Sequence, residues 1–147
     1  DLPPKLFMKA IFGSDFLYWV TIKLFGRSML HMFVPKSIND NISKDERNNL
    51  IREVLLSGFP VSQRKKGILF DTYISNPSMN ENLAYGKIKS PTLIIHAVDD
   101  PAPPIEGARY ISRSISNSEF ITFETGGHLI LNHEKEIGSA IDSFIYR

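Results

Sequence analysis

The 147-residue sequence contains no cysteine. This excludes a disulfide framework, a thiolate zinc site and a cysteine nucleophile, and it is typical of a protein in the reducing cytoplasm. The sequence also lacks an excess of charge of one sign, because it contains 17 Lys plus Arg and 16 Asp plus Glu. Since no basic block or RNA-binding signature is present, we do not expect nucleic acid as a partner.

A hydrophobic run long enough to cross a bilayer is also missing. The longest nearly apolar stretch covers residues 16–25, is too short to span and contains Lys23. We therefore expect a cytoplasmic chain with no membrane span. Hydrophobic residues make up 42% and charged residues 22% of the sequence, which is ordinary for a globular domain with a buried core.

The first half of the chain, residues 1–79, has the pattern of helices. Apolar residues at helical spacing follow Pro4, and Ser14 suits the N-cap of a second helix. That helix carries an aromatic run, residues 16–25, which is apolar on almost every side. A helix of this kind is usually buried or faces a second apolar surface, so we expect the run to form core; alternatively, one face of it lines an apolar substrate cavity.

Two further signals lie later in this half. Ser43 and Glu46 have the spacing of a capping box, in which each side chain satisfies the other residue's backbone N–H. The polar residues 36–42 before this box predict a loop. Beyond it, Gly58 and Pro60 end the helix, and another helix is predicted for residues 61–74.

Residues 80–147 have a β-α-β-α pattern. The segment Thr92–Val98 is continuously apolar, which is typical of a parallel strand covered on both faces. A helix that begins near Pro104 leads to a second predicted strand, Glu119–Phe123. A final helix follows, for which Asn132 can act as the cap. The crossover is expected to be right-handed, so both strands should run parallel.

The candidate catalytic residues lie where these two predicted strands end. Asp100 follows the first strand and His128 follows the second, and in open α/β sheets ligands bind beyond the carboxyl ends of the strands. A histidine can accept and return a proton near neutral pH, and a carboxylate at its other ring nitrogen fixes its orientation. Asp99 competes with Asp100 for this role. Alternatively, Asp100 is only a turn residue before Pro101 and His128 only a structural loop residue.

The other three histidines are expected to have structural roles. His96 should pack at the end of a strand, His133 should lie on the surface at the start of the last helix, and His31 belongs to the helical half. No metal-ligand spacing surrounds any of them, so no metal site is predicted.

Residues 90–147 resemble the C-terminal end of the α/β-hydrolase family. The matching segments are SPTLIIHAVDDP at 90–101, PIEGARY at 104–110 and GGHL at 126–129. The resemblance implies that Asp100 is the acid and His128 the base of a catalytic triad, in the family order nucleophile, acid, histidine. Asp100 is preferred to Asp99 because the family's acid lies three places after a glycine, whose position Ala97 occupies.

The resemblance also implies the fold class, which is α/β. Residues 1–79 would be a helical cap or lid region, and residues 80–147 the C-terminal β-α-β-α part of the core with its parallel sheet. The family's G-x-S-x-G nucleophile turn has no match, since the segment that begins Gly26-Arg27-Ser28 ends in Leu30. We therefore expect the serine and the oxyanion hole to precede Asp1, in a longer protein of which this chain is a natural or excised C-terminal part.

These inferences predict a serine-type hydrolase that acts on a carboxylic ester or similar acyl bond of a small molecule, without metal or cofactor. The isolated chain should be inactive and should pair with the N-terminal half of the hydrolase or with another copy. The alternative is a non-catalytic binding or interaction module derived from the same fold. A nucleotide-binding domain is disfavoured because no glycine-rich phosphate loop follows either strand. The substrate itself cannot be read from this pattern.

Overall fold

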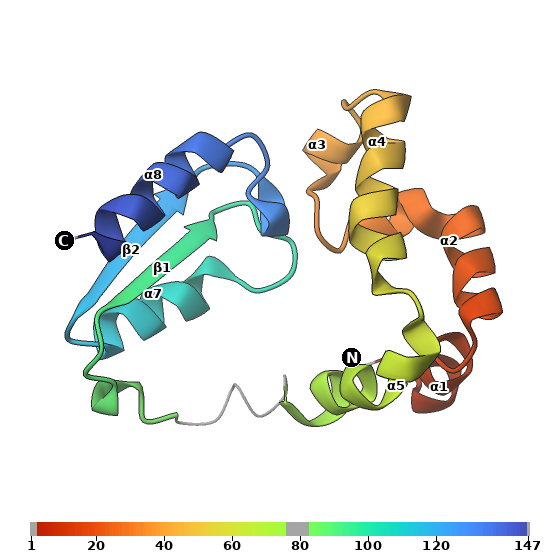
Figure 1. The fold of residues 1–147 in the computed structure, drawn as a ribbon, viewed down its shortest axis with the longest axis horizontal. Helices are drawn as coiled ribbons and strands as arrows, with labels where there is room; N and C mark the ends of the chain where they lie inside the picture. Colours follow the sequence, from red (N-terminus) through yellow and green to blue (C-terminus); the bar gives the residue numbers. More distant parts are fainter. Residues whose placement is uncertain (1–2, 76–82, 147) are drawn as a thin grey trace. The chain divides into compact units, whose positions relative to one another are not determined.

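The computed structural model describes residues 3–75 and 83–146, which form two compact units (Figure 1). Unit 1 comprises Asp1–Leu30 and Ile42–Leu83, and unit 2 comprises His31–Asn41 and Ala84–Arg147. The fold is α/β as predicted, with a helical region followed by a β-α-β-α region. The predicted boundary after residue 79 lies outside the described residues. In the structure His31–Asn41 groups with unit 2, although it interrupts the helical half in sequence.

Unit 1 is helical, and its predicted helices are confirmed. The longest, α2, continues through Gly26, where a side chain would meet another helix: a Cβ added there would lie 3.2 Å from Cδ1 of Ile51. No helix among the described residues is long and apolar enough to cross a membrane. The elements are α1 (Lys5–Ile11), α2 (Asp15–Leu30), α4 (Lys44–Leu50), η1 (Ile51–Leu55), η2 (Leu56–Gly58), α5 (Val61–Phe70) and η3 (Asp71–Ser75).

Side-chain caps fix the starts of these helices as predicted. Ser43 Oγ accepts from the Glu46 backbone N–H at 3.2 Å, and the Glu46 carboxylate accepts from the Ser43 N–H at 2.8 Å. The Ser43 hydroxyl and backbone together lower the pKa of Glu46. Ser14 caps α2 by accepting from the Leu17 N–H at 3.3 Å. Sequence-local hydrogen bonds therefore set two helix starts in this unit.

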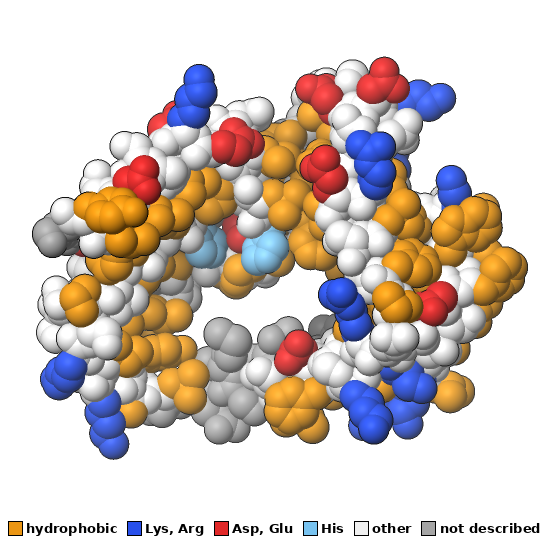
Figure 2. Space-filling model, in the orientation of Figure 1, with side chains coloured by type: hydrophobic (Ala, Val, Ile, Leu, Met, Phe, Trp, Pro, Cys, Tyr) orange, Lys and Arg blue, Asp and Glu red, His pale blue; other side chains and the backbone are white. Residues whose placement is uncertain are grey.

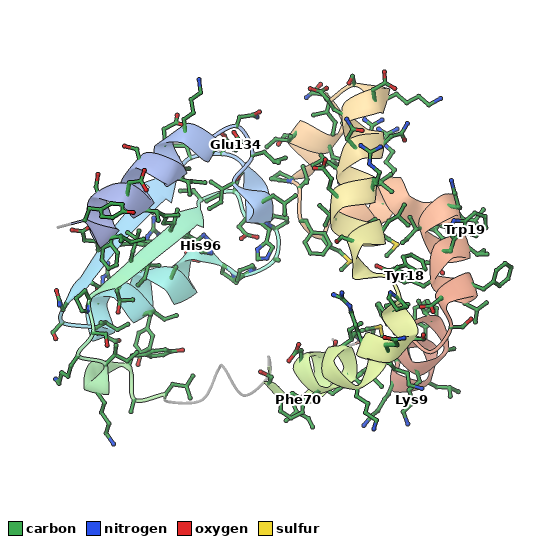
Figure 3. All side chains as sticks on the ribbon, in the orientation of Figure 1. Lys9, Tyr18, Trp19, Phe70, His96 and Glu134 are labelled. Carbon is green, nitrogen blue, oxygen red and sulfur yellow. The ribbon has the colours of Figure 1, made fainter. Side chains whose placement is uncertain are left out.

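The aromatic run of α2 is not core as a whole, and that expectation is wrong. Tyr18 is buried, but Phe16 is 70%, Phe25 57% and Trp19 44% exposed. Figure 2 shows hydrophobic side chains over α2, and in Figure 3 Tyr18 and Trp19 leave the helix in different directions. The reason is geometric: α2 buries one stripe at four-residue spacing, and the rest of its surface stays uncovered in this unit. The stripe is Tyr18, Ile22, Gly26 and Leu30.

Unit 2 is built on two parallel strands, β1 (Thr92–Ala97) and β2 (Ser118–Phe123), paired from Thr92↔Ser118 to Ala97↔Phe123. The strand bounds differ from the prediction by one residue each, because Val98 already lies in the turn. Helix α7 packs on both strands and α8 on β1. The remaining elements are α3 (Lys36–Asn39), η4 (Tyr85–Lys87), α7 (Ile105–Ser114), η5 (Gly127–Leu129) and α8 (Glu134–Ile145).

Three local expectations in unit 2 are wrong. The predicted loop at residues 36–42 contains the short helix α3. Asn132 does not cap α8, because its φ of 68° is left-handed and His133 occupies the N-cap position. His133 is not simply a surface residue either, since its ring stacks on Phe123 at a centroid distance of 4.3 Å. Helix α8 thus starts at a histidine that packs on β2 and makes no side-chain cap hydrogen bond.

Candidate active site

Asp100 and His128 meet at one end of the sheet in unit 2. Asp100 lies in the turn after β1, and His128 lies in η5, just after β2. Because parallel strands end at the same edge, the two loops are neighbours. His128 Nδ1 lies 2.9 Å from Asp100 Oδ2, which is the length of a charge-assisted hydrogen bond. The structure therefore brings together the two residues chosen from the sequence, while their catalytic role stays a prediction.

The Asp100 carboxylate is held by more than the histidine. Its Oδ1 accepts from the Ala102 backbone N–H at 2.8 Å, and its own backbone N–H donates to the Ala97 carbonyl at 3.3 Å. Its side chain is only 5% exposed. Because one oxygen is committed to the turn, the other is held facing the imidazole. The Asp-Pro turn that the sequence suggested is thus compatible with a role in orienting His128.

Asp99, the competing acid, has a different task. Its carboxylate accepts from the Gly127 N–H at 2.8 Å and from the Gly126 N–H at 3.3 Å. Both glycines have positive φ, 124° at Gly126 and 63° at Gly127. A Cβ at Gly126 would lie 2.9 Å from the backbone of Ile130, so only glycine fits there. Asp99 ties the histidine loop to the turn after β1 and does not touch the imidazole in any hydrogen bond of this region.

The contact with Asp100 determines which ring nitrogen of His128 carries the proton. A carboxylate can only accept, so Nδ1 must donate and the neutral ring has an unprotonated Nε2. The His128 side chain is 44% exposed. An accessible Nε2 with a free lone pair is what a general base needs.

His96, expected only to pack at the end of a strand, also lies near the Asp100 carboxylate. It sits on β1 (Figure 3), where its Nδ1 lies 2.7 Å from the Ala97 carbonyl oxygen. Its Nε2 is 3.9 Å from Asp100 Oδ2, and its side chain is 12% exposed. Across residues 3–75 and 83–146, no group of three or more His, Asp or Glu side chains could hold a metal ion.

Phe33 is a site residue that sequence reasoning missed. Its carbonyl accepts from the His128 backbone N–H at 2.8 Å, and the two rings lie 6.0 Å apart between centroids. No motif or periodicity links this residue to the histidine, so only the folded chain reveals the contact. Ser28, in the segment that begins like the nucleophile turn but ends in Leu30, lies inside α2 rather than on a strand-to-helix turn.

Comparison with known proteins identifies the family of this chain. Residues 71–147, more than half of the chain, match the profile of a family of α/β hydrolases described as TAP-like protein. A curated relative, the AB hydrolase superfamily protein YisY of Bacillus subtilis (strain 168), is 41% identical over 58 residues, which are 39% of this chain and 22% of the relative. The chain thus spans about a fifth of the length of that relative. No solved structure matches significantly. The chain belongs to the α/β-hydrolase family.

Proposed function

We propose that this chain supplies the acid and the base of a serine-type hydrolase. The observation that carries the proposal is the 2.9 Å contact between His128 Nδ1 and Asp100 Oδ2 at the shared edge of two parallel strands. Family membership supports hydrolysis as the reaction class. We propose a carboxylic ester or similar acyl bond of a small molecule as the substrate, with no metal or organic cofactor required.

In this mechanism His128 Nε2 removes the proton from a serine hydroxyl as its oxygen attacks the acyl carbon. The same proton then passes to the leaving alkoxide, and the C–O bond of the ester breaks to give an acyl-serine and an alcohol. Water deprotonated by His128 next attacks the acyl-serine, the bond between the acyl carbon and the serine oxygen breaks, and the proton passes from His128 to that oxygen as the carboxylic acid is released. Asp100 holds the ring in place and stabilises the imidazolium that forms twice in this cycle. The serine lies outside this chain.

The proposed partner is the nucleophile-bearing half of the hydrolase, or a second copy of the chain. In a parallel ladder alternate residues bond to one neighbour, and both Thr92 and Val98 donate to the β2 side. Leu93 and Ile95 therefore direct their backbone groups to the opposite edge of β1, where no strand lies among the described residues. Because this edge of β1 has no partner among the described residues and the strand carries half-buried apolar side chains, the edge favours pairing with a further strand.

The test compares the isolated 147-residue chain with a protein that joins it to its nucleophile-bearing half. We expect hydrolysis of p-nitrophenyl esters only by the joined protein, with His128→Ala lowering kcat by about 10⁴-fold. His133→Ala is the matched control and should keep kcat, because His133 stacks on Phe123 away from Asp100. Full activity of His128→Ala would exclude His128 as the base. Turnover by the isolated chain that His128→Ala abolishes would show that the nucleophile lies within it.

A second candidate, a binding module, is favoured by the exposed aromatic side chains of α2. Phe16 and Trp19 stack at a centroid distance of 6.4 Å, and Lys23 Nζ lies 5.6 Å from the Trp19 ring. An apolar patch beside a cation suits a long-chain acyl group with an anionic head. Because Trp19 is the only tryptophan, its emission reports binding directly. A saturable blue shift on adding laurate would support this function, and an unchanged spectrum would reject it.

A further inference from the structure

Residues His31–Asn41, called the strap from here on, lie against the loop that carries His128. We propose that Phe33 of this strap is a positioning residue for His128. The proposal rests on the assignment of His128 as the base. It goes further by saying which part of the molecule, apart from Asp100, sets the histidine in its productive orientation.

The strap contacts the histidine loop through its backbone and through its side chains. The Phe33 carbonyl accepts from the His128 N–H at 2.8 Å. The Phe33 ring is tilted by 42° on the imidazole at 6.0 Å. Gly127, directly before the histidine, is packed so closely that a Cβ there would overlap Pro35 and lie 2.7 Å from the Phe33 carbonyl oxygen. Two residues of the strap, Phe33 and Pro35, therefore hold two consecutive residues of the loop, Gly127 and His128.

The strap groups with unit 2, and two of its side chains are fully buried. Val34 and Asn39 are both 0% exposed. The Asn39 side-chain amide lies 3.2 Å from His31 Nδ1, so the first residue of the strap is tied to the helix α3 near its end. A segment with two fully buried side chains and an internal hydrogen bond can hold a loop in one position, because its own movement would expose those groups.

Asp100 and Phe33 constrain His128 at different points. The carboxylate holds Nδ1, whereas the strap holds the backbone nitrogen and one side of the ring. A single hydrogen bond leaves the ring free to swing about it, and the second set of contacts restricts that swing. Catalysis is sensitive to such restriction, since displacement of a reacting group by about 1 Å can cost ~10²-fold in rate. Phe33 contributes to catalysis through His128 and does not touch the substrate.

The test begins with NMR on the 147-residue chain carrying Phe33→Ala. We expect the His128 backbone amide to exchange about tenfold faster and the Nδ1–H tautomer of His128 to lose population. Met32→Ala is the matched control, because the neighbouring Met32 side chain is 57% exposed and should leave both signals unchanged. Phe33→Tyr keeps the ring and should restore both. Unchanged exchange and tautomer in Phe33→Ala would reject the proposal.

Two further measurements keep the outcome clear. If Phe33→Ala unfolds the chain, Pro35→Ala serves instead, because it removes the ring that packs against Gly127 and keeps Phe33. This variant should speed exchange of the His128 amide, while the amides of β1 that bond to β2 stay protected. In the protein joined to its nucleophile-bearing half, Phe33→Ala should lower kcat by about tenfold with KM within about twofold. Activity that survives His128→Ala would overturn the proposed function, whereas the NMR result would still decide whether Phe33 positions the histidine.

Discussion

Two adjacent aspartates follow β1, and they hold different partners. Asp100 faces the His128 ring, whereas Asp99 accepts hydrogen bonds from the backbone of Gly126 and Gly127, which precede His128. Both residues looked suitable from the sequence, because a one-residue shift in a turn cannot be resolved by spacing alone. The position of Ala97 in the family pattern favoured Asp100, and the geometry agrees. The decisive information is the direction in which each carboxylate leaves the turn.

We predict that Asp100→Asn and Asp99→Asn separate these two tasks. Asp100→Asn should lower kcat of the joined protein by about 10⁴-fold, because an amide can leave the imidazole in the wrong tautomer. Asp99→Asn should keep the His128 tautomer and cost about 1 kcal/mol of unfolding free energy, since it loses a charge-assisted hydrogen bond. Steady-state kinetics and thermal unfolding check the pair. Equal loss of kcat in both variants would contradict the division.

Tyr18 gives a second prediction at this scale. Its hydroxyl is buried and donates to the Leu55 carbonyl at 3.0 Å, and burial raises the pKa of Tyr18 above its usual value of 10.0. Its contribution to stability is therefore present below pH 10 and is lost as pH rises through the raised pKa. Tyr18→Phe should cost about 1 kcal/mol near pH 8. It should also remove part of the alkaline loss of stability, which denaturant unfolding between pH 8 and pH 11 measures.

At the scale of elements, sequence patterns predicted the local features well. The capping box, the parallel strand pair and the helix between them depend on residues close in sequence or on a regular period, and the structure contains all of them. The failures have another origin. The exposure of Phe16 and Trp19 depends on what covers α2, and the start of α8 depends on His133 stacking on Phe123. Both features depend on contacts with residues that lie elsewhere in the sequence, and a local pattern does not contain that information.

The capping box predicts a pH response of α4. Because hydrogen bonds from Ser43 lower the pKa of Glu46, the carboxylate stabilises the helix above its unfolded pKa near 4.5, and this stabilisation is lost as pH falls through the lower folded pKa. Ser43→Ala should destabilise unit 1 by about 1 kcal/mol at neutral pH. The difference between the two proteins should shrink as pH falls towards 3, as circular dichroism can follow. A constant difference would show that Glu46 does not take part.

At the scale of the whole molecule, the sheet has two strands in the part of the chain that the structure describes, and one edge of β1 has no strand beside it there. We predict alternating amide protection along β1 in the dilute chain, with Ile94 and His96 protected and Leu93 and Ile95 exchanging fast, because only the first pair faces β2. At high concentration, or in the joined protein, Leu93 and Ile95 should become protected as well. Hydrogen exchange followed by NMR checks this pattern. Uniform protection at low concentration would show that the edge is already covered.

The strap has a consequence for how the protein is made. Phe33 is synthesised long before His128, so their contact closes a loop of high sequence separation. Contacts of such high sequence separation form late, since the entropy of loop closure is paid before they stabilise anything. During synthesis the strap therefore leaves the ribosome before the loop that it contacts. The His128 loop can make its full set of contacts only once both β2 and the strap have been synthesised.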